Sequence, residues 1–237
     1  MEGNNMNIAI ILSGGTGNRF GGNTPKQYIK VGEKRIIDYS LRNLGDSPLI
    51  DYICIVAASE WQSILSDEMG DSVKGKFIGF ALPGGNRQLS IVNGMELVKS
   101  SLNLDTQAQH HIVFIHDAAR PYLTVEMIKL YINSMDKHDG VLPVLPMKDT
   151  IYLSDDGKKI SSLIDRKKLV AGQAPEVFDF AKYYKANMAL LPDDIKQING
   201  STEPAIMAGM DIAIVAGEEK NFKITTREDL ERFEQSL

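Results

Sequence analysis

Short apolar runs alternate with amphipathic stretches along most of this chain, and this alternation limits the available folds more than any other feature. A short apolar run bounded by turn residues is typical of a strand that is buried on both faces. Strands that alternate with helices form a mostly parallel sheet with helices on both faces. We therefore predict one α/β domain over residues 1–237, with strands at Asn7–Leu12, Tyr52–Ala57, Phe77–Leu82, His111–His116, Val141–Leu145 and Asp211–Val215.

Helices are predicted where apolar residues recur three or four positions apart, at Ile36–Leu44, Gln88–Leu102 and Val125–Lys137. Gly45 is expected to stop the first of these, because glycine is common just past a helix end. Thr124 is a plausible N-cap for the third. Thr226 and Asp229 resemble a capping box, with Asp in place of Glu or Gln, that opens a last helix.

One region interrupts the alternation. Thr150–Ser154 and Lys159–Ile164 read as two strands around an Asp-Gly turn, within an inserted arm at about 148–166. A hairpin of this size has little core of its own, so it either lies over the active site or pairs with another subunit. We favour pairing, and therefore expect a homodimer.

The composition excludes several classes of protein. A formal charge of -5 argues against a surface made mainly for nucleic acid. Cys54 is the only cysteine, which leaves no disulfide framework and no cysteine-rich metal site, and its apolar neighbours place it in a core strand. No apolar run is long enough to span a membrane, and no signal peptide precedes the first strand, so we expect a cytoplasmic location.

Glycine is concentrated directly after the first predicted strand, with five glycines in residues 14–22. Such a loop lets backbone N–H groups approach phosphate oxygens, and Arg19 and Lys26 add positive charge to it. A dinucleotide fingerprint read from Gly15 needs glycine where Phe20 stands, and the Gly-Lys-Ser/Thr end of a Walker A loop is absent. The loop therefore indicates a polyphosphate that is reacted upon.

A second segment, His116–Pro121, follows a predicted strand, where ligands of parallel sheets bind. Asp117 suits a magnesium ion or a ribose hydroxyl, and Arg120 suits a substrate phosphate. A local ion pair between Asp117 and Arg120 that only shapes a turn is an equal alternative. His116 is expected to be a packed or hydrogen-bonded residue at the strand end rather than a general base.

Two weaker segments complete the set. Pro83–Ser90 is a strand–Gly-Gly–helix junction, and a helix N-terminus of this kind suits a nucleotide base or phosphate. Asn221–Thr226 is expected to hold Lys223 on a short strand with its ammonium group toward a cavity or the opposite surface. A solvated surface lysine is the alternative for Lys223.

Together these segments resemble the cytidylyltransferase family of isoprenoid and polyol-phosphate metabolism, whose acceptors are 2-C-methyl-D-erythritol 4-phosphate and ribitol 5-phosphate. The match runs from about Asn7 to Leu230. It depends on Gly-Gly-x-Gly-x-Arg with Pro25-Lys26-Gln27, on His116–Pro121, on Lys148-Asp149-Thr150 and on Asn221–Thr225. The resemblance implies the Rossmann-like fold of nucleotide-diphospho-sugar transferases, a homodimer, and the use of CTP with Mg2+.

The resemblance also implies roles for individual residues. Arg19, Lys26 and Lys223 would be catalytic and surround the triphosphate and its α-phosphorus. Asp117 and Arg120 would hold the acceptor, with Thr150 and Arg166 contributed by the partner's arm, and Asp117 could also ligate magnesium that is held mainly by the CTP phosphates. The nucleotide would be bound by residues of three loops, Gly14, Gly15, Gly17, Gly84, Gly85, Ser90 and Ala118.

The acceptor stays open at this stage. Gly14-Gly15 and Trp61 look more like the ribitol-phosphate branch, while Ala118-Ala119 and Asp165-Arg166 look more like the methylerythritol branch. The balance leans slightly to ribitol 5-phosphate. Two departures, Ala174 in place of Thr and Pro204 within a Thr-Asp-Glu/Asp-Ala pattern, bear on acceptor contacts. A sugar-phosphate nucleotidyltransferase that uses another nucleotide, or a non-catalytic nucleotide-binding module, are the alternative functions.

Overall fold

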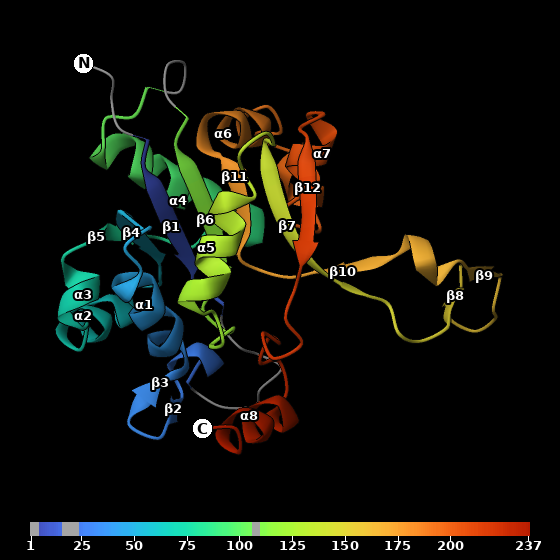
Figure 1. The fold of residues 1–237 in the computed structure, drawn as a ribbon, viewed down its shortest axis with the longest axis horizontal. Helices are drawn as coiled ribbons and strands as arrows, with labels where there is room; N and C mark the ends of the chain where they lie inside the picture. The colour runs from blue at the N-terminus through green and yellow to red at the C-terminus, as the bar shows by residue number, and fades with distance from the viewer. Residues whose placement is uncertain (1–4, 16–23, 106–109) are drawn as a thin grey trace.

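The computed structural model describes residues 5–15, 24–105 and 110–237, and it contains the six main predicted strands, shifted by at most one residue at either end (Figure 1). The strands are β1 (Asn7–Leu12), β2 (Lys30–Val31), β3 (Lys34–Arg35), β4 (Tyr52–Val56), β5 (Phe77–Ala81), β6 (Ile112–Asp117), β7 (Gly140–Pro146), β8 (Ile151–Leu153), β9 (Ser162–Ile164), β10 (Val170–Gly172), β11 (Glu176–Asp179) and β12 (Ile212–Ala216). The helices are α1 (Ile36–Asp46), α2 (Ser59–Asp67), α3 (Asp71–Lys74), α4 (Arg87–Ser101), α5 (Val125–Asn133), α6 (Phe180–Met188), α7 (Glu203–Met207) and α8 (Arg227–Glu234). Three 3-10 turns are η1 (Lys26–Tyr28), η2 (Arg166–Lys168) and η3 (Asp194–Gln197).

The main sheet has eight strands in the order β10-β7-β11-β6-β1-β4-β5, and β12 pairs with β7. Strands β1, β4, β5 and β6 are parallel, as are β7 and β12, while β10 and β11 run antiparallel to their neighbours. Leu12 is in register with Val56 and with Asp117, and Val56 is in register with Ala81. The carboxyl ends of four parallel strands therefore meet at one edge, which is where ligands bind in such sheets.

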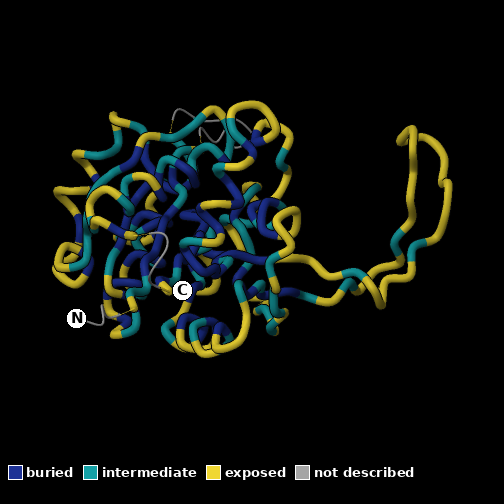
Figure 2. Tube along the Cα trace, turned by 90° about the horizontal axis from the view of Figure 1, so that it is seen from above, coloured by how far each residue is buried: buried dark blue, intermediate teal, exposed yellow. Residues whose placement is uncertain are grey.

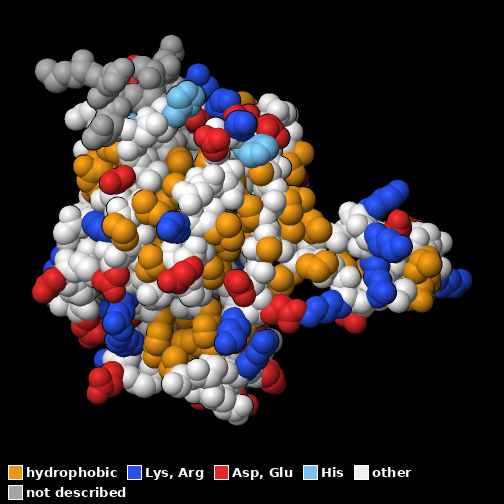
Figure 3. Space-filling view, in the orientation of Figure 1, with side chains coloured by type: hydrophobic (Ala, Val, Ile, Leu, Met, Phe, Trp, Pro, Cys, Tyr) orange, Lys and Arg blue, Asp and Glu red, His pale blue; other side chains and the backbone are white. Residues whose placement is uncertain are grey.

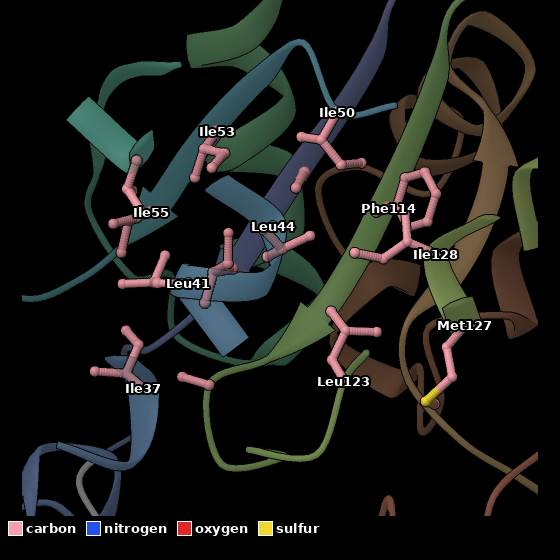
Figure 4. Close-up of a cluster of buried hydrophobic side chains, with 14 of the residues drawn as sticks. Ile37, Leu41, Leu44, Ile50, Ile53, Ile55, Phe114, Leu123, Met127 and Ile128 are labelled. Carbon is pink, nitrogen blue, oxygen red and sulfur yellow. The ribbon is translucent and has the colours of Figure 1, made fainter. Parts of the chain in front are cut away.

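Helices cover both faces of the sheet. Alternate residues of each central strand point to opposite faces, so each strand contributes to two layers of core. On β1, Ala9 and Ile11 pack against α1, α2, α3 and α5, and Figure 4 shows this side of the core. Ile8 and Ile10 face the other side, where α4, α6 and α7 pack. Cys54 is fully buried on this second side, as predicted. The mostly parallel sheet with helices on both faces that the alternation predicted is confirmed, as is the Rossmann-like fold that the resemblance implied.

A long arm leaves the sheet at the end of β7 and returns through β10 (Figures 1 and 2). Its hairpin is shorter than predicted, since β8 and β9 pair over only three residues each. Several large apolar side chains of the arm are exposed, namely Tyr152, Leu153, Ile160 and Leu163. Figure 3 shows that Lys and Arg side chains share this surface.

Three local predictions are corrected. Gly45 does not stop α1, which continues to Asp46. Glycine is needed there for another reason: α1 packs closely on α3, and an added Cβ would lie 2.9 Å from the Val73 nitrogen. Helix α5 ends at Asn133 rather than Lys137. Residues 221–225 form no strand and are held as a loop, in which the Ile224 N–H donates to the Ala119 carbonyl.

Two predicted helix starts are confirmed. The Thr124 side chain accepts a hydrogen bond from the Met127 N–H and caps α5. At α8, Thr226 and Asp229 form a reciprocal capping box. Within the described residues, no helix is long and apolar enough to cross a membrane.

Candidate active site

Three loops meet at the carboxyl edge of the parallel strands. The Ser13 N–H donates to the Val56 carbonyl, and the Ala118 N–H donates to the Leu12 carbonyl, so the loops after β1 and β6 are tied to neighbouring strand ends. Gly14 lies against the loop after β5, where an added Cβ would stand 2.5 Å from the Pro83 side chain. The predicted nucleotide segments are therefore brought together, although Arg19 and Gly17 lie outside the described residues.

The turn η1 braces the start of the glycine-rich loop. The Gln27 side-chain amide donates to the carbonyls of Ser13 (2.7 Å) and Gly15 (2.8 Å), and the Tyr28 hydroxyl donates to the Ser13 carbonyl (2.9 Å). Both side chains are buried, so these bonds hold the loop start firmly. Lys26, immediately before Gln27, is thereby fixed next to the loop that it was predicted to serve.

The junction between β5 and α4 is a tight turn that needs glycine at one position. A Cβ on Gly84 would stand 2.4 Å from the Leu89 side chain and 2.9 Å from the Ser90 nitrogen. The Ser90 hydroxyl accepts from the Gly84 N–H (3.0 Å) and donates to the Asn86 carbonyl (2.8 Å). At Gly85 the nearest atom to an added Cβ is 3.9 Å away, so this backbone is open to a ligand. Asn86 caps α4 by accepting from the Leu89 N–H.

Asp117 is the centre of a charged cluster at the end of β6. Its Oδ1 pairs with Arg87 Nη1, and its Oδ2 lies 3.0 Å from Lys223 Nζ and 3.5 Å from Arg120 Nε. Burial opposes ionisation of this carboxyl, but the three cations outweigh it and hold the Asp117 pKa well below its usual range. Asp117 is therefore ionised and holds three cations together at the carboxyl end of β6.

The loop at 221–225 brings Lys223 to this cluster. Arg120 Nη1 donates to the Asn221 carbonyl (2.6 Å), and Asn221 Nδ2 donates to the Ala174 carbonyl (2.8 Å). Lys223 therefore forms an ion pair with Asp117 while its side chain stays 38% exposed to solvent. The local Asp117–Arg120 ion pair exists, and it is one part of a larger cluster.

His116 is fully buried one residue before Asp117. Its Nε2–H donates to the Arg120 carbonyl (3.1 Å). Burial lowers the pKa of His116 to about 4, so the ring is neutral near pH 7. This confirms the prediction of a packed, hydrogen-bonded strand-end residue.

Comparison with known proteins identifies the family. The family model for "2-C-methyl-D-erythritol 4-phosphate cytidylyltransferase" matches residues 7–237. A protein of that name from Clostridium acetobutylicum is 33% identical over 226 residues, which cover 95% of this chain and 94% of the relative. This chain belongs to the 2-C-methyl-D-erythritol 4-phosphate cytidylyltransferase family.

Other relatives agree. A cytidylyltransferase of the same name from Thermosipho melanesiensis is 30% identical over 225 residues, covering 95% of each chain. Among solved structures, the Francisella tularensis cytidylyltransferase has a TM-score of 0.79 and 25% identity over 98% of this chain and all of that one (100%). A structure from Anaerococcus prevotii, at 24% identity and a TM-score of 0.80, shows the same fold over 98% of both chains.

Two charged residues at the Asp117 cluster, Arg87 and Glu176, were not singled out from the sequence. Arg87 lies at the start of α4, and its Nε and Nη2 donate to the Ser201 hydroxyl (3.1 and 2.9 Å). Glu176 begins β11, with its Oε1 3.9 Å from Arg87 Nη2. Arg87 lies within the Pro83–Ser90 segment, which was predicted to bind a nucleotide, but a charged residue at a helix start is usually solvated. Strand β11, which carries Glu176, was not predicted at all.

Thr150 and Arg166 lie on the arm, apart from the Asp117 cluster of the same chain (Figure 1). Both are exposed, and Arg166 Nη1 donates to the Lys148 carbonyl at the base of the arm. The single chain therefore does not bring these two predicted acceptor residues to the Asp117 cluster.

The described residues do not fit a magnesium ion held by the protein itself. Both oxygens of Asp117 already face Arg or Lys side chains, and these cations would repel a magnesium ion near the same oxygens. Within the described parts of the chain, no group of three His, Cys, Asp or Glu side chains could hold a metal ion. The cationic cluster instead suits phosphate oxygens.

Proposed function

We propose that this chain transfers CMP from CTP to 2-C-methyl-D-erythritol 4-phosphate, releasing pyrophosphate and forming a CDP-polyol. The observation that carries the proposal is the Asp117 cluster, in which Arg87, Arg120 and Lys223 gather beside the strand-end loops. A phosphate monoester and a triphosphate are both polyanions, so a site that joins them has to supply positive charge. The family of the chain supports CTP as the nucleotide.

The reaction needs little from the protein besides position and charge. A phosphate oxygen of the acceptor attacks the α-phosphorus, a new P–O bond forms, and the bond between the α-phosphorus and the oxygen bridging to the β-phosphorus breaks with its electrons leaving on pyrophosphate. The acceptor phosphate is largely dianionic near pH 7, with a second pKa of about 6, so no general base is required. A neutral, buried His116 and an ion-paired Asp117 agree with such a mechanism.

We assign Lys26, with Arg19, to the triphosphate. Gln27 and Tyr28 hold η1, and so Lys26, against the start of the glycine-rich loop, which we expect to bind the phosphates. We assign Lys223 to the space between the α-phosphorus and the acceptor phosphate. We assign Arg120, with Asp117, to the acceptor. We assign the nucleotide to the loops that carry Gly14, Gly15, Gly17, Gly84, Gly85 and Ala118. Of the described glycines, Gly15 and Gly85 have open space where a Cβ would stand, and Ser90 braces the Gly84 turn.

We propose that Mg2+ arrives on the CTP phosphates, since the described residues offer no carboxylate site for it. Bound there, it would supply charge neutralisation to the triphosphate. A cytoplasmic location remains a prediction, supported by a single cysteine that is buried in β4.

We propose that the arm makes a homodimer. Tyr152, Leu153, Ile160 and Leu163 are 47–66% exposed on the arm, and apolar surface of this kind marks an interaction site. A partner's arm that docked near the site would supply its Thr150 and Arg166. Light scattering should give a dimer mass for the wild type and a monomer mass for Leu163→Asp, with Lys158→Asp as an exposed control; a monomeric wild type would contradict the dimer.

The acceptor is chosen from the family and from packing. Gly14-Gly15 and Trp61 had favoured ribitol 5-phosphate, but Gly14 is needed for contact with Pro83, and Trp61 stacks on Tyr28 with ring centroids 4.2 Å apart. Packing therefore explains Gly14 and Trp61, whereas Gly15 has open space where a Cβ would stand. The names of the relatives then favour 2-C-methyl-D-erythritol 4-phosphate.

A substrate panel tests the proposal. Pyrophosphate release is measured with CTP, UTP, GTP or ATP against 2-C-methyl-D-erythritol 4-phosphate and ribitol 5-phosphate. We expect turnover with CTP and the methylerythritol phosphate, at a kcat/KM well above every other pair. Preference for ribitol 5-phosphate would correct the acceptor, preference for another nucleotide would favour a sugar-phosphate nucleotidyltransferase, and CTP binding without pyrophosphate release would favour a non-catalytic module.

A further inference from the structure

A second carboxylate lies beside the Asp117 cluster and has no part in the proposed chemistry. Glu176 pairs with Ile115 across β11 and β6, two residues before Asp117, so both carboxylates lie on the face of the sheet that α4 covers. The Glu176 side chain is only 13% exposed. A buried carboxylate is costly unless a cation compensates it, which indicates a use for Glu176.

Arg87 is the cation placed between the two carboxylates. Its Nη1 pairs with Asp117 Oδ1, and its Nη2 lies 3.9 Å from Glu176 Oε1. Its Nε and Nη2 donate to the Ser201 hydroxyl, and the Ser201 carbonyl accepts a hydrogen bond from the Tyr183 hydroxyl (2.7 Å). The guanidinium is therefore fixed on three sides.

This arrangement leaves the second oxygen of Asp117 for Lys223. With Glu176 charged, Arg87 is shared between two anions and neutralises only part of Asp117. Without that charge, Arg87 would be drawn to Asp117 alone and would compete with Lys223 and Arg120 for it.

We infer that Glu176 is a positioning residue that, through Arg87, keeps Asp117 Oδ2 available to Lys223 and so holds the Lys223 ammonium toward the reacting phosphates. The inference rests on the proposed function for the role of Lys223. Glu176 acts on Asp117 through Arg87, whose Nη2 lies 3.9 Å from Glu176 Oε1.

The charge on Glu176 varies with pH in a way that exposes its role. Burial raises the Glu176 pKa above its ordinary value of 4.5, against the opposing effect of Arg87 and of the nearby Ser201 and Thr202 hydroxyls. The other ionisable groups that act with it are Asp117 on β6, Arg120 after β6 and Tyr183 on α6. Positioning is therefore lost as the pH falls through the raised pKa of Glu176.

Glu176→Gln removes the charge and keeps the shape. Where Glu176 of the wild type is ionised, we expect kcat to fall about three- to tenfold, toward the lower end of the coupling between residues of one charged network. The KM for the acceptor should not rise, because the site becomes more positive. The ratio of wild-type to variant kcat should approach one as the pH falls and Glu176 of the wild type becomes protonated. The acceptor's own ionisation affects both proteins equally and cancels in this ratio.

Two controls isolate the network. Glu126→Gln makes the same charge change in an exposed position on α5, across the sheet, and should leave kcat unchanged. In an Arg87→Gln background, Glu176→Gln should have no further effect. A ratio that is constant with pH, or an equal loss in the Arg87→Gln background, would overturn the inference.

Unfolding measurements give a readout without turnover. Because the folded-state pKa of Glu176 is raised, its ionisation destabilises the folded protein as the pH rises. The unfolding midpoint of Glu176→Gln, relative to that of wild type, should therefore rise as the pH is raised from 5 to 8. In an Arg87→Gln background this gain should be larger. Absence of turnover in wild type would refute the proposed function, whereas a gain unaffected by Arg87→Gln would refute the Glu176–Arg87 coupling.

Discussion

Removing the charge of Asp117 is expected to destabilise the fold as well as the site. Asp117→Asn keeps the size of the side chain but leaves Arg87, Arg120 and Lys223 to repel one another. Breaking a buried ion pair costs about 3–5 kcal/mol. The Arg87 and Lys223 side chains are 32% and 38% exposed, so water screens them, and we take the lower end, about 3 kcal/mol. That loss corresponds to a fall of roughly 6–12 °C in Tm for a chain of this size.

The assay is thermal unfolding at several pH values. The folded-state pKa of Asp117 lies below its ordinary value of 3.8, so its contribution is present above that value and is lost as the pH falls below it. The difference between wild type and Asp117→Asn should therefore be constant from pH 5 to 8 and shrink only below about pH 4. Asp193→Asn, which breaks an exposed pair with Lys196, is the matched control and should change Tm little. An Asp117→Asn protein as stable as wild type at pH 7 would refute the reasoning.

Three further predictions concern individual residues. Cys54 should not react with a thiol reagent until the protein unfolds, because burial raises its pKa to about 12; rapid labelling of the native protein would contradict this. His116 should stay neutral in an NMR titration from pH 8 to 5.5, and the fold should lose stability as the pH falls from 6.5 toward 4, since the unfolded chain binds the proton first; titration near 6.5 would oppose its burial. Thr226→Ala should lower stability by about 1 kcal/mol in urea unfolding, because it removes the cap of α8, and an unchanged midpoint would count against the capping box.

The sequence predicted best those features that depend on local periodicity. The buried strands β1, β4 and β6 follow from apolar runs, and the capped starts of α5 and α8 follow from Thr124 and Thr226. Gly45 shows where local signals fail, because the approach of α3 and not chain termination requires glycine there. Strand β11 was missed because it is short, with only four residues, and its pairing with β6 and β7 is non-local.

The candidate site divides in the same way. Asp117 ends β6, Arg120 lies in the loop after it, and Lys26 follows the glycine-rich loop, so sequence order already indicates a ligand near them. Arg87 and Glu176 could not be predicted, because their role comes from a charge pairing between α4 and β11 across 89 positions of chain (176 minus 87). Only the packed sheet shows that they belong with Asp117.

The most direct measurement is the kcat/KM of Lys26→Ala for CTP and 2-C-methyl-D-erythritol 4-phosphate, taken together with its unfolding midpoint. Lys26 is proposed to stabilise negative charge that develops in the transition state, and loss of one such group costs about 100- to 1,000-fold. Truncation of a partly exposed lysine leaves no core cavity, so Tm should change little. A fall of about 100-fold or more at unchanged Tm is the expected result. Wild-type turnover in a Lys26→Ala protein, or no pyrophosphate release by wild type, would contradict charge-assisted cytidylyl transfer at this site.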